Sequence, residues 1–450
     1  MADMVKYIFS LLAGVALVLA GAVFFVNQAH PSREFAAGSA DVSAPSAMPG
    51  VTEKPIEERI KEAQEKSSKI KGLYMTAEVA NDGGAGATRL RNSIIHLADT
   101  TEINGIVIDV KEVCGSEYNE ERMKKLIAEL HAKHIWAIAR IVAFKDSSQI
   151  NAHPEWYLTR AAPKAVSDQC GNKLYLRAKN PEGKKSEVAL WRDDKGGYWL
   201  DPASVGARDY IVNVGKSAID MGFDELQFDY IRFPSDGDVD NARFPFWDGK
   251  TPKFAVLKSF FAFLHDSLKQ YKPDIILSAD MFGYAAIRAG DVGIGQRLED
   301  VGSSFDYVSF MVYPSHYYSG LNLPADPAHH LPAVNYNRRE VRYHPDVTVG
   351  RSLQVAQDFL DSLMASSSAS TTIGTPIGAD ASSVAAHIVR LRPWLEDFFH
   401  EADKSAHRPY GAQKVRMQIN GAENVASSGW LLWNAANVYT QDALEKQEEK

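Results

Sequence analysis

The sequence predicts a (β/α)8 TIM barrel of the α/β class, preceded by an N-terminal transmembrane helix and a linker. Short apolar segments rich in β-branched and aromatic residues recur along the chain, and amphipathic helical segments separate them. The apolar segments are hydrophobic almost throughout instead of alternating with polar residues, which is typical of parallel strands covered by helices. Residues 70–440 hold the expected barrel, and this length lies inside the range for the fold.

Eight strands are expected, and they occupy residues 72–77, 105–110, 135–142, 225–231, 275–282, 307–313, 387–395 and 429–433. No glycine-rich phosphate loop follows the first strand, so a closed barrel is favoured over an open dinucleotide-binding sheet. Long insertions are expected at about 143–200 and 315–386, after the third and sixth strands. Barrel loops on that side of the strands build active sites.

Residues 1–27 are interpreted as a membrane anchor or signal segment. The stretch Tyr7–Val26 has twenty residues without a charge, enough to cross a bilayer as a helix. It is long for a signal peptide and no convincing cleavage site follows, so an uncleaved anchor is favoured over secretion after cleavage. Lys6 precedes the stretch, and the positive-inside rule then places the barrel outside the cytoplasm, in the periplasm or at the cell surface.

Residues 28–69 are expected to form a linker and a short helix. The part at 31–54 is rich in Pro, Ser, Ala and Gly, a composition that buries too little apolar surface to fold. Residues 55–69 have helix-forming composition with few large apolar side chains, which predicts a mostly solvated helix. Residues 441–450 form a charged tail.

Charge and composition exclude several classes of protein. The net charge is -8 and no cluster of Lys and Arg is present, which argues against nucleic-acid binding. His329 and His330 lie in a Pro-rich insertion, and no HExxH or other metal motif occurs, so no metal or other cofactor is predicted. The two cysteines, Cys114 and Cys170, fit neither a zinc module nor a redox motif. They follow strands two and three and could form a disulfide in an oxidising compartment.

Three expected strands carry an aspartate after their apolar stretch, one or two residues before the end: Asp109, Asp229 and Asp280. Because an unpaired carboxylate inside a barrel is costly, these side chains are expected at the C-terminal rim, where barrel active sites lie. Each alone could instead cap a helix or pair with a neighbouring Arg. Asp229 is the strongest candidate, and Arg232, three residues later, is its expected ion-pair partner.

Cations and aromatic residues lie near the ends of the same strands. An aromatic platform with charged neighbours suits a sugar, which has apolar ring faces and a rim of hydroxyl groups. A single Trp, such as Trp394 or Trp433, is more often part of a packed core. With Asp109 and Arg232, the candidate substrate-binding residues are Lys111, Glu112, Arg140, Tyr313, His316, Trp394, Asp397, Trp433 and Asn434.

A family resemblance follows from ordered motifs along the chain, among them GIVIDVKE, HPEWYL, FDELQFDYIRFPSDG, ADMFGY, DYVSFMVYPSHY, RPWLEDF and GWLLWNAANVYT. Over about residues 70–440 the sequence resembles a family of bacterial and archaeal glycoside hydrolase domains of TIM-barrel type, catalogued without an assigned function. The resemblance implies glycosidic-bond hydrolysis without supplying a substrate. Position by position, it favours Asp229, Arg232, Asp280, Tyr313, Asp397 and Trp433 as site residues.

The sixth and eighth strands also resemble those of chitinase-like barrels, with one departure. Those barrels have an acid two residues beyond the last Asp of strand four, where this chain has Ile231. The second acid must therefore come from another strand, and Asp280 is the first choice. Glu112, Asp397 and Glu396 are the reserves, and Glu396 stands where the family's motif usually has Gln.

These observations favour a glycoside hydrolase acting on an envelope or extracellular polysaccharide. Asp229 would be the nucleophile or base and Asp280 the catalytic proton donor, with retention or inversion both open. The alternative is a barrel that binds glycans or supports the envelope without catalysis, since fold does not fix function. A metal-dependent deacetylase would need a His and Asp ligand set that the sequence does not show.

The apolar stretch Tyr7–Val26 leads to a test of topology. The protein should remain in the membrane fraction, and protease added to intact spheroplasts should digest residues 70–440, because these lie outside the cytoplasm. Protection of the barrel from protease, or a mature N-terminus near residue 30, would contradict the anchored topology.

Overall fold

The structure is a computed structural model that describes residues 54–115, 118–160, 169–170, 189–288, 290–370, 389–398, 410–426 and 428–446. The expected anchor, the linker up to residue 53 and the last four residues of the charged tail lie outside the described residues. Within the described ranges, no helix has both the length and the hydropathy that crossing a membrane requires.

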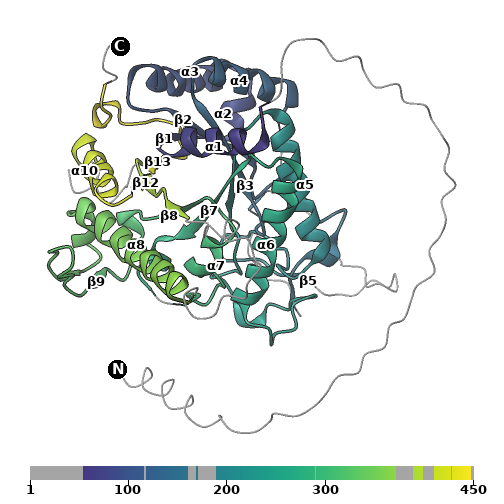
Figure 1. Cartoon of the computed structure of the whole chain (residues 1–450). Coiled ribbons are helices and arrows are strands. Elements are labelled where there is room, and N and C mark those ends of the chain that lie inside the picture. Colours follow the sequence, from purple (N-terminus) through teal and green to yellow (C-terminus); the bar gives the residue numbers. More distant parts are fainter. Residues whose placement is uncertain are drawn as a thin grey trace, which may run out of the picture. The chain divides into compact units, whose positions relative to one another are not determined.

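The central element is a closed parallel β-barrel surrounded by helices (Figure 1). Neighbouring strands pair in the order β1, β2, β3, β6, β7 and β8, and then through β12 and β13 back to β1. β11 and β12 follow one another at a single position between β8 and β13, so the barrel has eight positions. The strands are β1 (Ile70–Met75), β2 (Gly105–Lys111), β3 (Trp136–Val142), β6 (Glu225–Asp229), β7 (Ile276–Phe282), β8 (Tyr307–Met311), β11 (Arg390–Leu391), β12 (Trp394–Glu396) and β13 (Gly429–Trp433).

Helices connect consecutive strands on the outside of the barrel (Figure 1). Local sequence sets their ends: the hydroxyl of Ser204 caps the first turn of α5, and Gly222, with a φ of 102°, ends that helix. The helices are α1 (Ile56–Ser67), α2 (Ala77–Asn81), α3 (Ala85–Thr100), α4 (Glu120–Ala132), α5 (Val205–Met221), α6 (Lys253–Tyr271), α7 (Leu298–Gly302), α8 (Pro345–Ser370) and α10 (Ala412–Glu423).

All eight expected strands are present, which confirms the predicted barrel. The insertion after β3 contains the antiparallel pair β4 (Thr159–Arg160) and β5 (Ala189–Leu190). The insertion after β8 contains the pair β9 (Leu321–Leu323) and β10 (Val334–Tyr336), and also the long helix α8, which the sequence reasoning had not separated from the insertion.

The predicted disulfide is confirmed. Cys114 and Cys170 are bonded, and their Cα atoms are 5.5 Å apart. Cys114 lies two residues beyond Glu112, in the turn where Glu112 and Gly115 exchange backbone hydrogen bonds. The disulfide therefore ties the turn after β2 to the insertion after β3.

A buried ion pair closes the N-terminal end of the barrel. One guanidinium nitrogen of Arg392 donates to both carboxylate oxygens of Glu225 at 2.8 Å, and both side chains are fully buried. Arg392 also donates to the backbone oxygen of Ser67 at the end of α1, at 2.8 Å. The expectation that α1 is mostly solvated is confirmed, and Ser67 at its end is the residue that is buried against the barrel.

Breaking this ion pair should destabilise the barrel. Glu225→Gln should lower the free energy of unfolding by about 3 kcal/mol, since it leaves the buried Arg392 without its counter-charge. The matched control is Glu120→Gln, whose partner Lys124 is 48% exposed and which should leave the unfolding midpoint unchanged. Chemical denaturation of the full chain measures both. An unchanged midpoint in Glu225→Gln would show that the pair does not stabilise the barrel.

Candidate active site

Three aspartates and one arginine meet inside the C-terminal half of the barrel. Asp229 is the last residue of β6, and Asp109 and Asp280 lie near the ends of β2 and β7. Arg140 lies on β3, between β2 and β6, and is in register with Asp109. Because side chains alternate along a strand, these positions all face inward.

Arg140 contacts all three aspartates. One terminal guanidinium nitrogen donates to Asp109 Oδ1 at 2.6 Å, and the other donates to Asp229 Oδ2 at 2.5 Å. Its Nε is 3.9 Å from Asp280 Oδ2. Burial alone would lower the pKa of Arg140, but Asp109 and Asp229 outweigh this effect and raise the pKa above its usual value. The arginine is therefore a fixed positive charge among the carboxyl groups.

Asp280 differs from the other two aspartates in its environment. Its Oδ1 accepts hydrogen bonds from Trp394 Nε1 and Gln227 Nε2, both at 2.8 Å. Its Oδ2 is buried and has no hydrogen-bond partner among the described residues. Burial, and secondly the charge of Asp229, raise the pKa of Asp280 well above its usual value. The surroundings of Asp280 therefore favour the protonated acid.

Glu112 is a second acid with a raised pKa, and it lies at the turn after β2. Burial and the nearby charge of Asp109 raise the pKa of Glu112 to about 7. Glu112 is only partly buried, whereas the side chain of Asp280 is 1% exposed. Glu112 is thus the more accessible of the two groups that favour a proton.

Aromatic rings surround the carboxyl groups. Tyr74 donates through its hydroxyl to Asp109 Oδ2, and its ring lies 6.1 Å from that of Trp433. Tyr313 lies 6.0 Å from Trp433 in a stacked arrangement, and His316 lies 5.1 Å from Tyr313. The rings of Tyr313, Trp433 and His316 therefore form one cluster, in which Tyr313 is buried. Trp394 is buried below it and orients Asp280.

The structure corrects the expected role of Arg232. Its Nη1 donates to the backbone oxygen of Phe233 at 3.0 Å, and its guanidinium lies 4.6 Å from the ring centre of Phe282. Asp229 forms its ion pair with Arg140 instead, because β3 is the strand beside β6. Arg232 therefore packs against aromatic rings and holds the backbone of the loop that follows Asp229.

Lys111 lies outside the Arg140 cluster. Its ammonium group pairs with Asp146 at 2.9 Å and donates to the backbone oxygen of Val142 at 2.5 Å. Both side chains of this ion pair are fully buried. A slip in register between Asp109 and Lys111 accompanies this change of direction. The geometry gives Lys111 a role in joining β2 to the segment after β3.

Asp397, Asn434 and Glu396 hold loops together. Asp397 accepts hydrogen bonds from the backbone nitrogen and the hydroxyl of Thr440 at 2.7 and 2.6 Å, while burial raises its pKa to about 6. Asn434 donates to the backbone oxygens of Asp397 and Val438, both at 2.5 Å. Glu396 accepts from the backbone nitrogen of Ser315 at 3.2 Å, which links β12 to the loop after β8.

Sequence reasoning missed three residues of the site: Tyr74, Gln227 and Tyr230. Tyr74 on β1 and Gln227 on β6 both face the inside of the barrel. Because side chains alternate along a strand, counting back two residues from Asp229 would have indicated Gln227, and the same count along β1 would have indicated Tyr74. Tyr230 has a φ of 52°, in the left-handed region, and its backbone nitrogen donates to Asp229 Oδ1 at 2.6 Å. Backbone strain of this kind concentrates at functional sites. No pattern of residue types in the sequence predicts the left-handed conformation of Tyr230.

A closed parallel barrel with acids, an arginine and aromatic rings toward the C-terminal ends of its strands is an arrangement that TIM-barrel glycoside hydrolases share. Residues 72–439 match the family model described as "Putative glycosyl hydrolase domain". The chain belongs to this family, which confirms the resemblance found in the sequence.

Solved structures also resemble the chain. A hypothetical protein from Ruminiclostridium thermocellum is 27% identical, with 46% of this chain and 96% of that chain covered and a TM-score of 0.34. The glycoside hydrolase domain of PgaB (BpsB) from Bordetella bronchiseptica is 11% identical, with 82% and 95% covered and a TM-score of 0.46. An α-galactosidase from Thermus thermophilus is 11% identical, with 82% and 58% covered and a TM-score of 0.42. No curated protein matches the sequence.

Proposed function

We propose that this domain hydrolyses glycosidic bonds in an envelope or extracellular polysaccharide by a two-carboxylate mechanism. Asp229 acts as nucleophile or base, and Asp280 donates the proton to the leaving oxygen. The observation that supports this assignment best is the contrast between them: Asp229 is paired with Arg140, whereas Asp280 has a raised pKa and an unbonded Oδ2. Two neighbouring carboxyl groups in different environments are the usual basis of acid and base roles.

The charges of the cluster suit the reaction. Asp109 and Asp229 bring two negative charges against the one positive charge of Arg140, so the site is net negative when Asp280 is protonated. A fixed negative site stabilises the positive charge that develops on the sugar in an oxocarbenium-like transition state. The Asp229 side chain is 10% exposed, which leaves part of it open to a ligand.

The environment of Asp280 shows which of its oxygens would carry the proton. Its Oδ1 already accepts two hydrogen bonds, so the proton belongs on Oδ2, which has no partner among the described residues. A buried polar atom without a partner is costly. A glycosidic oxygen placed beside Oδ2 would accept that hydrogen bond and then the proton.

Glu112 is the alternative proton donor. Its pKa of about 7 suits an acid that works near neutral pH, and its partial exposure lets a leaving group reach it. The disulfide at Cys114 fixes the turn that bears Glu112. Comparing variants of the two acids separates these assignments.

A polysaccharide of the envelope is a consistent substrate for a barrel that lies outside the cytoplasm. The disulfide is consistent with an oxidising compartment, where disulfides persist. The stretch Tyr7–Val26 is the proposed anchor that would hold the barrel at the envelope. The rings of Tyr313 and Trp433 are the proposed platform for a sugar ring.

Replacing Asp229 tests the central role. Asp229→Asn should abolish turnover and leave glycan binding and folding nearly intact, because the amide keeps the size of the side chain and loses its charge. Asp266→Asn, an 81%-exposed position on α6, is the matched control and should keep full activity. The measurement is reducing-end release by the full chain on a polysaccharide panel. Full activity in a folded Asp229→Asn variant contradicts the assignment, and binding without turnover in the unmodified chain favours a non-catalytic barrel.

The identity of the proton donor is tested with two leaving groups. Asp280→Asn should slow hydrolysis of a natural glycoside far more than that of an activated aryl glycoside, because a good leaving group needs little protonation. Glu112→Gln is the matched comparison and should affect both substrates equally. The reverse pattern, with the leaving-group effect in Glu112→Gln, would transfer the acid role to Glu112. The readout is the ratio of kcat/KM for the two substrates in each variant.

A further inference from the structure

A second group of ionisable side chains lies outside the barrel, where the loop between β9 and β10 contacts α8. The loop turns tightly, since Asp326 and Leu331 exchange backbone hydrogen bonds at 2.8 and 2.9 Å. Arg351 on α8 donates to the backbone oxygens of Pro324 and Pro332 at the two ends of this loop. The turn therefore has a defined position on the helix.

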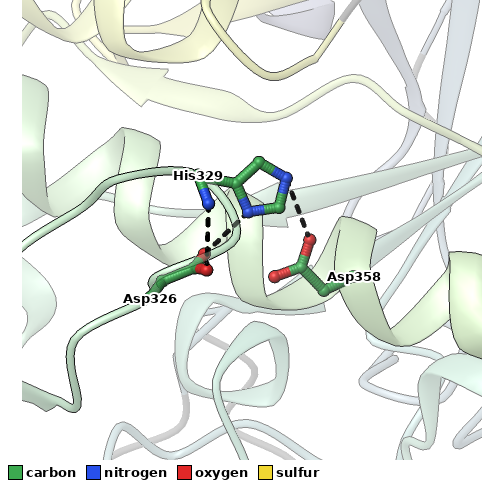
Figure 2. A group of neighbouring side chains, drawn as sticks. All are labelled: Asp326, His329 and Asp358. Atoms are coloured by element: carbon green, nitrogen blue, oxygen red, sulfur yellow. Dashed lines mark hydrogen bonds and ion pairs between the residues drawn. The ribbon is translucent and has the colours of Figure 1, made fainter.

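The turn presents His329 between two aspartates (Figure 2). Its Nδ1 lies 2.8 Å from Asp326 Oδ2, and its Nε2 lies 3.8 Å from Asp358 Oδ1 on α8. One potential ligand atom from each of these three residues lies within 4.8 Å of the others. The side chain of His329 is 42% exposed, so an ion from solvent can reach it.

The hydrogen bond to Asp326 orients the imidazole ring of His329 so that one nitrogen can bind an ion. When Nδ1 donates its hydrogen to Asp326, the lone pair of Nε2 is directed at the Asp358 side. A histidine ligand usually donates its other nitrogen to a carboxylate in this way, which fixes the orientation of the ring. Asp326 is therefore placed as an orienting residue, and Nε2 as the nitrogen that would bind.

Gln354 offers a third ligand from the same helix. Its Nε2 is 3.1 Å from His329 Nε2 and 2.8 Å from Asp358 Oδ1. Rotating the amide by half a turn brings its oxygen to this place. An imidazole nitrogen, a carboxylate oxygen and an amide oxygen would then face one point. His329 Nε2 and Asp358 Oδ1 would need to move only a few tenths of an ångström closer to each other for both to bind one ion at about 2.0–2.2 Å.

The charge around His329 is negative. Asp326, Asp358 and Asp361 all act electrostatically on the ring. Among the residues that the structure describes, His329 is the one basic side chain in ion-pair contact with Asp326 or Asp358. A divalent cation bound here would offset the charge of these carboxylates.

We propose that His329, Asp358 and Gln354 bind one divalent transition-metal ion, with Asp326 orienting the histidine. One imidazole with oxygen ligands suits Zn²⁺, Co²⁺ or Mn²⁺ better than the all-oxygen ions Mg²⁺ and Ca²⁺. The ion is structural: it links the loop between β9 and β10 to α8. The site lies outside the Arg140 cluster and does not depend on the proposed hydrolysis.

Calorimetric titration with Zn²⁺ alone tests the site in the purified full chain. The unmodified chain should bind one Zn²⁺ that Mg²⁺ does not displace. His329→Ala and Asp358→Asn should weaken that binding by more than 100-fold, and Asp326→Asn by about 10-fold or more, as expected for an orienting residue. The matched control is His330→Ala, which removes the neighbouring imidazole and should change nothing.

Hydrogen exchange supplies a second, independent readout. Saturating Zn²⁺ should slow amide exchange in residues 324–333 of the unmodified chain and of His330→Ala, and leave it unchanged in His329→Ala. Equal Zn²⁺ affinity in the unmodified chain, His329→Ala and Asp358→Asn would overturn the proposal, as would the lack of any one-to-one binding. If one variant fails to fold, the other still decides the question.

Discussion

One arginine, Arg140, organises the C-terminal end of this barrel. Arg140 is held by ion pairs to Asp109 on one side and Asp229 on the other, and Asp280 lies within 3.9 Å of its Nε. Removing these charges from water costs several kcal/mol for each ion, and the cost is offset only when every carboxylate is paired or protonated. The pairing of Asp109 and Asp229 therefore leaves Asp280 as the group that favours a proton, which is the property a catalytic acid needs.

Much of this arrangement could be predicted from the sequence, because strand periodicity and the aspartates at strand ends are local patterns. Asp109, Asp229 and Asp280 were expected to emerge together at the C-terminal rim. They do meet at that end of the barrel, but they are buried inside it, where Arg140 supplies a positive charge for them. The partner of Asp229 was missed because closeness in the chain favoured Arg232. Inside a barrel the neighbouring strand decides the contact, and β3 brings Arg140 from 89 residues away.

Residues in loops were harder to predict for a related reason. Asp397 and Asn434 match motif positions, yet their hydrogen bonds fix the segment after β13, and Lys111 turns away from the interior at a register slip. A motif reports that a residue type is needed and does not say whether it binds a ligand or holds a loop. The turn that places His329 beside α8 depends on long-range contacts of the same kind, so a solvated insertion was expected there.

The dependence of the site on Arg140 is tested most directly by a double-mutant cycle in the purified full chain. Arg140→Met should lower the free energy of unfolding by about 3 kcal/mol or more, since it leaves buried carboxylates unpaired. Combining it with Asp109→Asn, which removes one of those charges, should recover about 1 kcal/mol or more relative to the sum of the single losses. Urea denaturation measures all four proteins. Losses that simply add, or an Arg140→Met variant as stable as the unmodified chain, would contradict the account.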